Sequence, residues 1–183
     1  MNIIKITGVQ DALAELKKGI ECGLHGIIYM VSDSQYVAVH KHTQVNDECC
    51  TTLGYTICEE YCNGGVIVLN KGDFMFAHFG KIDSGWASKF ADYFTRWLEV
   101  KGLAAEYVGN DILIDGCKVC GLGITRYGRI DYTCGFIGIN TNLEHIKAIC
   151  RKTMEKVPMG LSEYGITTED VEEMFLNFCA ATS

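Results

Sequence analysis

Apolar and polar positions along the chain follow two patterns, one typical of helices and the other typical of strands. Apolar residues that recur every three or four positions predict helices, which cover residues 11–22, 84–100 and 143–152, with a last helix beginning near residues 167–170. Short apolar runs bounded by turn residues predict strands, which cover residues 26–31, 36–40, 65–69, 74–79, 112–114, 118–125 and 132–140. The aromatic residues from Trp86 to Trp97 fall on one helix face, so we expect them in the core.

The segments between neighbouring strands predict how the strands pair. The polar turn 32–35 joins strands 26–31 and 36–40, and the turn 70–73, with its glycine at 72, joins strands 65–69 and 74–79. An Asp-Gly pair at 115–116 is a typical two-residue hairpin turn. Strands and helices are intermixed without regular βαβ alternation. We therefore expect an α+β domain with a mixed, largely antiparallel β-sheet flanked by helices.

Length and composition limit the class of protein. The chain has 183 residues, of which 48% are apolar and 21% charged, as in ordinary globular proteins. No apolar run reaches the ~20 residues of a membrane span, and the first residues lack the apolar core of a signal peptide. We expect a single domain over residues 1–183, without membrane association, in the cytoplasm. There the ten cysteines would be mostly reduced thiols.

The distribution of charge is more informative than its total. A net charge of −7 argues against non-specific binding to nucleic acid, which depends on Lys and Arg. No Lys or Arg lies between Lys41 and Lys71, whereas four acidic residues do. An anionic ligand contacted by this interval would have to be met by backbone N–H groups or by residues from elsewhere in the chain.

The stretch from Gly109 to Gly121 is the best candidate for chemistry. Lys118 follows a tight turn and is surrounded by glycines and short apolar residues, so it is expected to be partly desolvated. A lysine ammonium in such a place attracts a carboxylate or phosphate more strongly than in water. Asn110 and Asp111 could point polar groups at the same place. The alternative is an ordinary hairpin whose lysine is solvated.

Two other groups of residues suggest metal or redox chemistry less strongly. Cys117 and Cys120 form one Cys-x-x-Cys pair, which is only half of a structural zinc site, and two unrelated packed thiols are the favoured interpretation. His40 and His42 on a strand are favoured as surface or pocket-lining side chains. We therefore predict no structural metal.

The order of motifs after Gly109 resembles the superfamily of lipoate–protein ligases, octanoyltransferases and biotin–protein ligases. In those enzymes an Asn-Asp-Leu segment leads through a turn to Lys-[Ile/Val]-[Ser/Ala]-Gly, and a His-Gly strand ending in Leu-Asn or Ile-Asn follows. The corresponding segments here are Asn110–Leu113, Lys118–Gly121 and Gly135–Asn140. The N-terminal half is similar to lipoate–protein ligases: Asn63-Gly64-Gly65 resembles their glycine loop, and Lys41 stands where an arginine is usual.

The resemblance implies transfer of a lipoyl or octanoyl group, with a biotinyl group as the less favoured alternative, to a lysine of a lipoyl-type carrier domain. A ligase would form an acyl adenylate from ATP with Mg²⁺, whereas a transferase would take the acyl group from a carrier. Lys118 would be the central catalytic residue. The substrate-binding residues would be Lys41, Asn63, Gly64, Gly65, Asn110, Asp111, Gly121, Cys134 and Gly135. The length implies a catalytic domain without the accessory C-terminal or DNA-binding domain of some relatives.

Three departures from the family keep other interpretations open. Glu59 and Glu60 replace an arginine pair before the glycine loop, Met159 stands where octanoyltransferases carry a nucleophilic cysteine, and Cys134 replaces a histidine. The chain could therefore be a degenerate ligase that binds a small acid or a protein partner. It could also be one subunit of a split lipoate ligase, or it could use a thiol, with the Lys118 ammonium lowering the pKa of Cys120.

Overall fold

The computed structural model describes residues 2–22, 25–39, 44–59, 66–81, 85–127, 130–150 and 154–182. The ten strands within these ranges are β1 (Ile3–Lys5), β2 (Gly26–Val31), β3 (Tyr36–Val39), β4 (Thr56–Glu59), β5 (Val66–Leu69), β6 (Phe74–Lys81), β7 (Ala105–Val108), β8 (Asp111–Ile114), β9 (Cys117–Tyr127) and β10 (Ile130–Ile137). They form a seven-stranded sheet in the order β1-β2-β6-β10-β9-β8-β7 and a three-stranded sheet in the order β4-β3-β5. Only the β1–β2 and β3–β4 pairs are parallel among the described strands, which confirms a mixed, largely antiparallel architecture.

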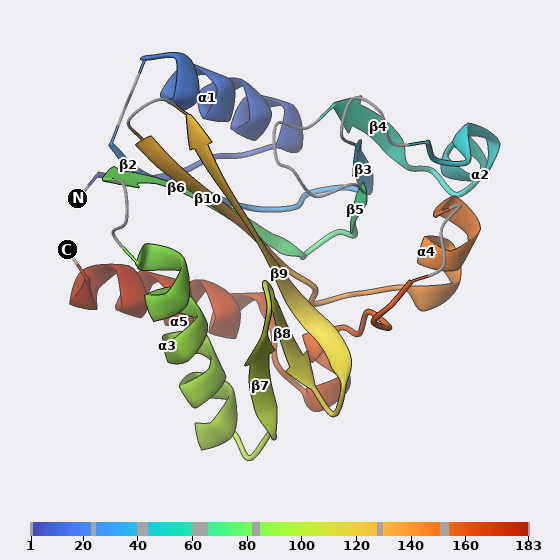
Figure 1. The fold of residues 1–183 in the computed structure, drawn as a ribbon. Helices are drawn as coiled ribbons and strands as arrows, with labels where there is room; N and C mark the ends of the chain where they lie inside the picture. Colours follow the sequence, from blue (N-terminus) through green and yellow to red (C-terminus); the bar gives the residue numbers. More distant parts are fainter. Residues whose placement is uncertain are drawn as a thin grey trace.

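The helices cover both faces of the larger sheet. They are α1 (Val9–Cys22), α2 (Asp47–Thr52), α3 (Trp86–Val100), α4 (Leu143–Ile149) and α5 (Thr168–Ala181), with a 3₁₀ turn at Leu161–Tyr164. Helix α1 lies on one side of the seven-stranded sheet and α3 with α5 on the other, while α2 and α4 lie beside the smaller sheet (Figure 1). No helix in the described ranges is long and apolar enough to cross a membrane.

The main hydrophobic core lies between the large sheet and the α3–α5 layer. Trp86, Phe90 and Phe94 of α3 are buried there, as their helical spacing predicts. The rings of Phe76 and Phe90 pack with their centroids 4.6 Å apart, and Phe175 of α5 packs on Phe76 at 4.9 Å. This core packs against the middle of the large sheet, where β9 and β10 carry the residues from Lys118 to Gly121 and from Cys134 to Gly135.

The first two predicted hairpins are wrong, because their strands belong to different sheets. Strand β2 pairs with β6 in the large sheet, and β3 pairs with β5 in the small one, both antiparallel. The two connecting turns hydrogen-bond to each other instead: Ser32 N donates to Asp73 O at 2.8 Å, and Gly72 N donates to Ser32 O at 2.8 Å. The chain therefore crosses from one sheet to the other twice at the same place, which sets the small sheet beside the large one.

The third predicted hairpin is confirmed. Asp115 and Gly116 both have positive φ (50° and 77°), as a tight two-residue turn between β8 and β9 requires. The pairing shifts by one residue between Ile112 and Leu113, so that Leu113 pairs with Lys118 and Ile112 pairs with Cys120. This β-bulge places the Lys118 side chain on the same side of the ribbon as Asp111.

Candidate functional site

A cavity of about 420 Å³ lies between the small sheet and the β9–β10 part of the large sheet. Most of its described lining is apolar, and the charged side chains in that lining contact one another at one end. Its described lining consists of Val66, Ile67, Val68, Met75, Asn110, Asp111, Lys118, Gly121, Leu122, Gly123, Ile124, Cys134, Gly135, Phe136, Ile146, Cys150, Met154, Lys156 and Pro158. A largely apolar cavity with a few convergent polar groups is the usual form of a small-molecule site.

Two lysines share one carboxylate at the polar end. Lys118 Nζ lies 2.7 Å from Asp111 Oδ1, and Lys156 Nζ lies 2.7 Å from Asp111 Oδ2. Lys156 Nζ also donates to the carbonyl oxygen of Val108 at 3.3 Å. Two positive side chains against one negative leave one net positive charge at this end of the cavity, which suits an anion.

Burial and the two neighbouring lysines act in opposite directions on the pKa of the Asp111 carboxyl. Partial burial by itself would raise the pKa of the Asp111 carboxyl, but hydrogen bonds from Lys118 and Lys156, together with their charges, lower that pKa overall. All three side chains are partly buried, with 20% of the Asp111, 36% of the Lys118 and 30% of the Lys156 side chain exposed. The carboxylate is therefore ionised at neutral pH, and the lysines retain surface that a ligand can contact.

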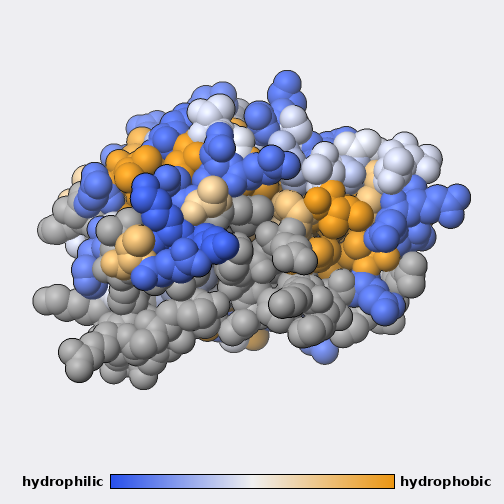
Figure 2. Space-filling view, turned by 90° about the horizontal axis from the view of Figure 1, so that it is seen from above, coloured by the Kyte–Doolittle hydropathy of each residue, from blue (hydrophilic) through white to orange (hydrophobic). Residues whose placement is uncertain are grey.

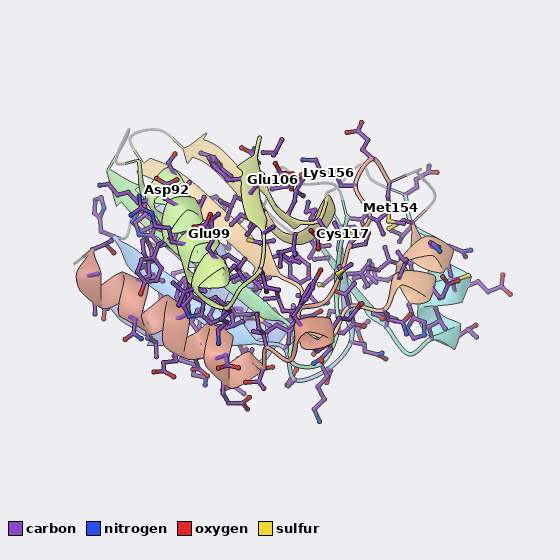
Figure 3. All side chains as sticks on the ribbon, turned by 90° about the horizontal axis from the view of Figure 1, so that it is seen from below. Asp92, Glu99, Glu106, Cys117, Met154 and Lys156 are labelled. Carbon is purple, nitrogen blue, oxygen red and sulfur yellow. The ribbon has the colours of Figure 1, made fainter. Side chains whose placement is uncertain are left out.

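Backbone pairing brings Lys156 next to Lys118 from a distant part of the sequence. The segment 157–159 runs parallel to β9 at Lys118, with Lys118 N donating to Val157 O at 2.8 Å and Met159 N donating to Lys118 O at 2.9 Å. Figure 3 shows Met154 and Lys156 beside the small sheet, on the residues that lead into this segment, whereas Asp92 and Glu99 extend from α3, away from it.

Gly121 makes room for the Lys118 side chain. A Cβ atom at position 121 would lie 2.8 Å from both Cε and Nζ of Lys118, and 3.5 Å from Asp111 Oδ1. Any side chain here would displace the ammonium from the carboxylate. The glycine that the sequence pattern placed three residues after the lysine therefore has a physical reason: the lysine lies across it.

Neither cysteine of the predicted thiol route offers a reactive thiolate. Burial raises the pKa of the Cys120 thiol, and this outweighs the lowering by the Lys118 charge, so the expected activation by the ammonium is wrong. Cys134 lines the cavity but is disulfide-bonded. Cys117 and Cys120 of the Cys-x-x-Cys pair are not joined to each other and are both free thiols.

The structure brings together every predicted site residue that it describes. These are Asn110, Asp111, Lys118, Gly121, Cys134 and Gly135, and all six line the same cavity. The other four, Lys41, Asn63, Gly64 and Gly65, lie outside the described residues, as do His40, His42 and Glu60. Sequence reasoning missed Lys156. The only signal was its place just before Val157-Pro158-Met159-Gly160, the segment aligned with the late motif of the family.

The surface beside the small sheet is partly apolar. Figure 2 shows one face of the molecule, on which apolar residues gather over the region of the three-stranded sheet and polar residues cover the outer helices. Apolar side chains of β5 (Val66, Ile67 and Val68) form the small-sheet wall of the cavity. The base-free interval of the sequence thus contributes apolar surface to the site, and the cations come from the opposite wall.

Comparison with protein families gives a match over residues 10–178 to the family described as lipoyl protein ligase A/B catalytic domain. The chain belongs to this family. Its suspected relationship to lipoate–protein ligases is thereby confirmed, and the match covers all but the first nine and last five of the 183 residues. Among curated proteins, a comparison by sequence finds no match.

Solved structures of lipoate ligases have the same fold as this catalytic domain. A bipartite lipoate protein ligase from Thermoplasma acidophilum, described with its E2 lipoyl domain, aligns with a TM-score of 0.80 at 14% identity, over 99% of this chain and 82% of that one. A lipoate-protein ligase A bound with ATP aligns with a TM-score of 0.81 at 13% identity, over 99% of this chain and 84% of that one. LipL1 of P. falciparum in complex with lipoate gives 0.81 at 12% identity, over 98% of this chain but 59% of that one.

Proposed function

We propose that the protein is an ATP-dependent acyl ligase that attaches a lipoyl or octanoyl group to a lysine of a lipoyl-type carrier domain. The observation that carries this proposal is the cavity: one end holds two lysines and one carboxylate, and the rest is apolar and 420 Å³ in volume. A medium-length acid matches such a site because its carboxylate meets the cations while its chain is removed from water.

Two balanced steps would make the amide bond. In the first, a carboxylate oxygen of the acid attacks the α-phosphorus of ATP, and pyrophosphate leaves, giving an acyl adenylate. In the second, the carrier lysine amine attacks the acyl carbonyl, loses a proton and expels AMP. Lys118 would neutralise the charge that develops on the carbonyl and phosphate oxygens, where a desolvated cation is most effective. Asn110 and Asp111 would lie at the phosphate end of the ligand.

The chain's own residues favour a ligase over an octanoyltransferase. A transferase would need a nucleophilic thiol to hold the acyl group as a thioester. Met159 stands at the family position of that thiol, and its thioether packs against the main core. The pKa of the buried Cys120 thiol is raised, which weakens it as a nucleophile. An adenylate route requires no thiol.

A relative built from two chains supports a further part of the proposal. The Thermoplasma acidophilum lipoate ligase is described as bipartite, together with its E2 lipoyl domain. We propose that a second ligase subunit can complement this chain in the transfer step, with a carrier domain of the same kind as acceptor. Formation of the acyl adenylate would then be measurable on the chain alone, and transfer would increase when the second subunit is added.

The test measures the two steps separately. Purified protein is incubated with ATP and either lipoate or octanoate, and acyl-AMP is quantified by mass spectrometry; an acceptor lipoyl domain is then added and its intact mass followed. We expect acyl-AMP and a mass increase with the wild type, and a loss of about 100-fold or more with Lys118→Met. Lys101→Met, a partly exposed lysine paired with Asp170 away from the cavity, is the control. Absence of acyl-AMP with both acids would refute the ligase and leave a degenerate binding protein.

A further inference from the structure

Magnesium is the ion that the family implies at an adenylate site, and the described residues that line the cavity do not offer it a place. Mg²⁺ requires oxygen ligands in near-octahedral geometry. Asp111 is the only carboxylate among the described residues that line the cavity, and a lysine ammonium lies 2.7 Å from each of its two oxygens. A divalent cation bound to this carboxylate would have to displace a lysine or lie in direct contact with its charge.

Lys156 lies on the Asp111 oxygen to which such a cation would have to bind. Lys118 already pairs with one oxygen of Asp111, and that lysine–aspartate pair by itself has no net charge. Lys156 adds the second positive charge on the other oxygen and is held there by the Val108 carbonyl at 3.3 Å. With 30% of its side chain exposed, Lys156 lines the cavity and keeps one of its three N–H donors for a ligand.

We propose that Lys156 is a built-in counter-cation for the phosphate of the acyl adenylate, so that this intermediate is bound without a divalent metal. The inference rests on the proposed ligase function and extends it. It concerns the adenylate held in the cavity, and it leaves aside the magnesium that accompanies ATP in solution. An adenylate phosphate carries one negative charge, which matches the one net positive charge of the Asp111–Lys118–Lys156 triad.

This role also accounts for the unusual charge distribution of the sequence. The interval between Lys41 and Lys71 contains no Lys or Arg, and its strand β5 forms an apolar wall of the cavity. Among the described residues, the cations that can neutralise a phosphate at the polar end therefore lie on the opposite wall. Lys118 on β9 and Lys156 on the segment paired with it are the two lysines that line this cavity in the described part of the chain.

The test uses a stable mimic of the intermediate, an adenosine 5′-acylsulfamate carrying an octanoyl or lipoyl chain, titrated into the full chain by calorimetry in EDTA and in excess MgCl₂. For the wild type we expect the same Kd within about twofold in both buffers. Lys156→Met should weaken binding in EDTA by about tenfold or more, because a charge-assisted hydrogen bond is lost. Magnesium should restore part of that loss, since Asp111 Oδ2 is then free to act as a ligand.

Two further variants separate charge from structure. Lys156→Arg keeps the cation and should bind like the wild type in EDTA, and Lys101→Met, a lysine paired with a carboxylate elsewhere, should behave like the wild type in both buffers. Binding of the mimic by the wild type only in magnesium would overturn this inference while leaving the ligase proposal intact, as would unchanged affinity of Lys156→Met in EDTA. Absence of binding in both buffers would overturn both proposals.

Discussion

Gly121 and Gly135 both line the cavity, but a methyl group at each would meet very different neighbours. At Gly121 it would overlap the flexible end of Lys118, which can move aside, and would meet Asp111 Oδ1 at an ordinary contact distance. At Gly135 it would overlap the ring of Phe76, which is fully buried in the main core. The first glycine is thus required by the position of a functional side chain, and the second by the packing of β10 on β6.

Gly121→Ala should therefore impair activity without unfolding the protein. We expect the rate of acyl-adenylate formation to fall about 10- to 100-fold, since displacing a positioned group by about an ångström costs this much. Its free energy of unfolding should change by less than about 1 kcal/mol. Gly135→Ala, the matched variant, should lose about 1–3 kcal/mol by overpacking. Urea unfolding and the acyl-AMP assay measure both effects; a large loss of stability in Gly121→Ala would contradict the assignment.

Asp111 should contribute to the pH dependence of stability with a definite sign. The two lysines hold its pKa below the ordinary value despite its burial. A carboxyl with a lowered pKa stabilises the fold at pH above its unfolded pKa of about 4, and this contribution is lost as the pH falls through its lower folded pKa. The difference in unfolding free energy between wild type and Asp111→Asn should be constant above about pH 5 and shrink below about pH 4. If the difference in unfolding free energy between wild type and Asp111→Asn were the same at pH 3 and pH 7, ionisation of Asp111 would not be its cause.

At the scale of residues, the sequence allowed Lys118, Asn110, Asp111 and Gly121 to be predicted because they are neighbours around one turn, where spacing along the chain fixes spacing in space. Lys156 could not be found in this way. It reaches Asp111 only because the segment 157–159 pairs with Lys118, and no periodicity in the sequence encodes that pairing.

At the scale of elements, one buried carboxylate holds the turn between the two sheets. Asp73 is fully buried, and its carboxylate accepts hydrogen bonds from the backbone N–H groups of Asn70, Ile139 and Asn140 at 2.7–2.8 Å. Asp73 thereby ties the β5–β6 turn to the end of β10. Asp73→Asn should lower the unfolding free energy by about 2 kcal/mol or more, because an amide N–H₂ would face these donors. Asp33→Asn on an exposed turn is the control. Equal melting curves for both variants would contradict a stabilising role of the Asp73 carboxylate.

Strands were easier to predict than their partners. The alternation of apolar and polar positions depends on burial of one strand face, which is a local property, and the predicted strands exist. A turn between two strands does not determine that they pair, since β2 and β3 diverge into separate sheets after the turn 32–35. Elements missed by the sequence analysis, such as β1, β7 and α2, are short and half exposed, so their patterns carry little signal.

At the scale of the whole molecule, the crossing of the chain between two sheets creates the site. The cavity exists because the small sheet stands beside β9 and β10 instead of extending the large sheet. One wall is apolar and comes from the base-free interval, and the other carries the cations. In the proposed function the carboxylate of the acid would be met from the β9 side, whereas β5 offers only apolar surface to its chain. Changes in the β5 wall should therefore alter chain-length preference without altering the charge chemistry.

Val66→Phe tests whether β5 sets the preference for acyl-chain length. Val66 lies on β5 in the cavity wall, so a larger side chain should shorten the space for an acyl chain while leaving the lysine triad in place. We expect kcat/KM for adenylate formation with octanoate to fall about tenfold or more relative to butanoate, since a few methylene contacts are worth this much. Val100→Phe, at an exposed position on α3, should leave the ratio unchanged. An equal loss of kcat/KM with both acids would mean that β5 supports the fold and does not set the preferred length of the acyl chain.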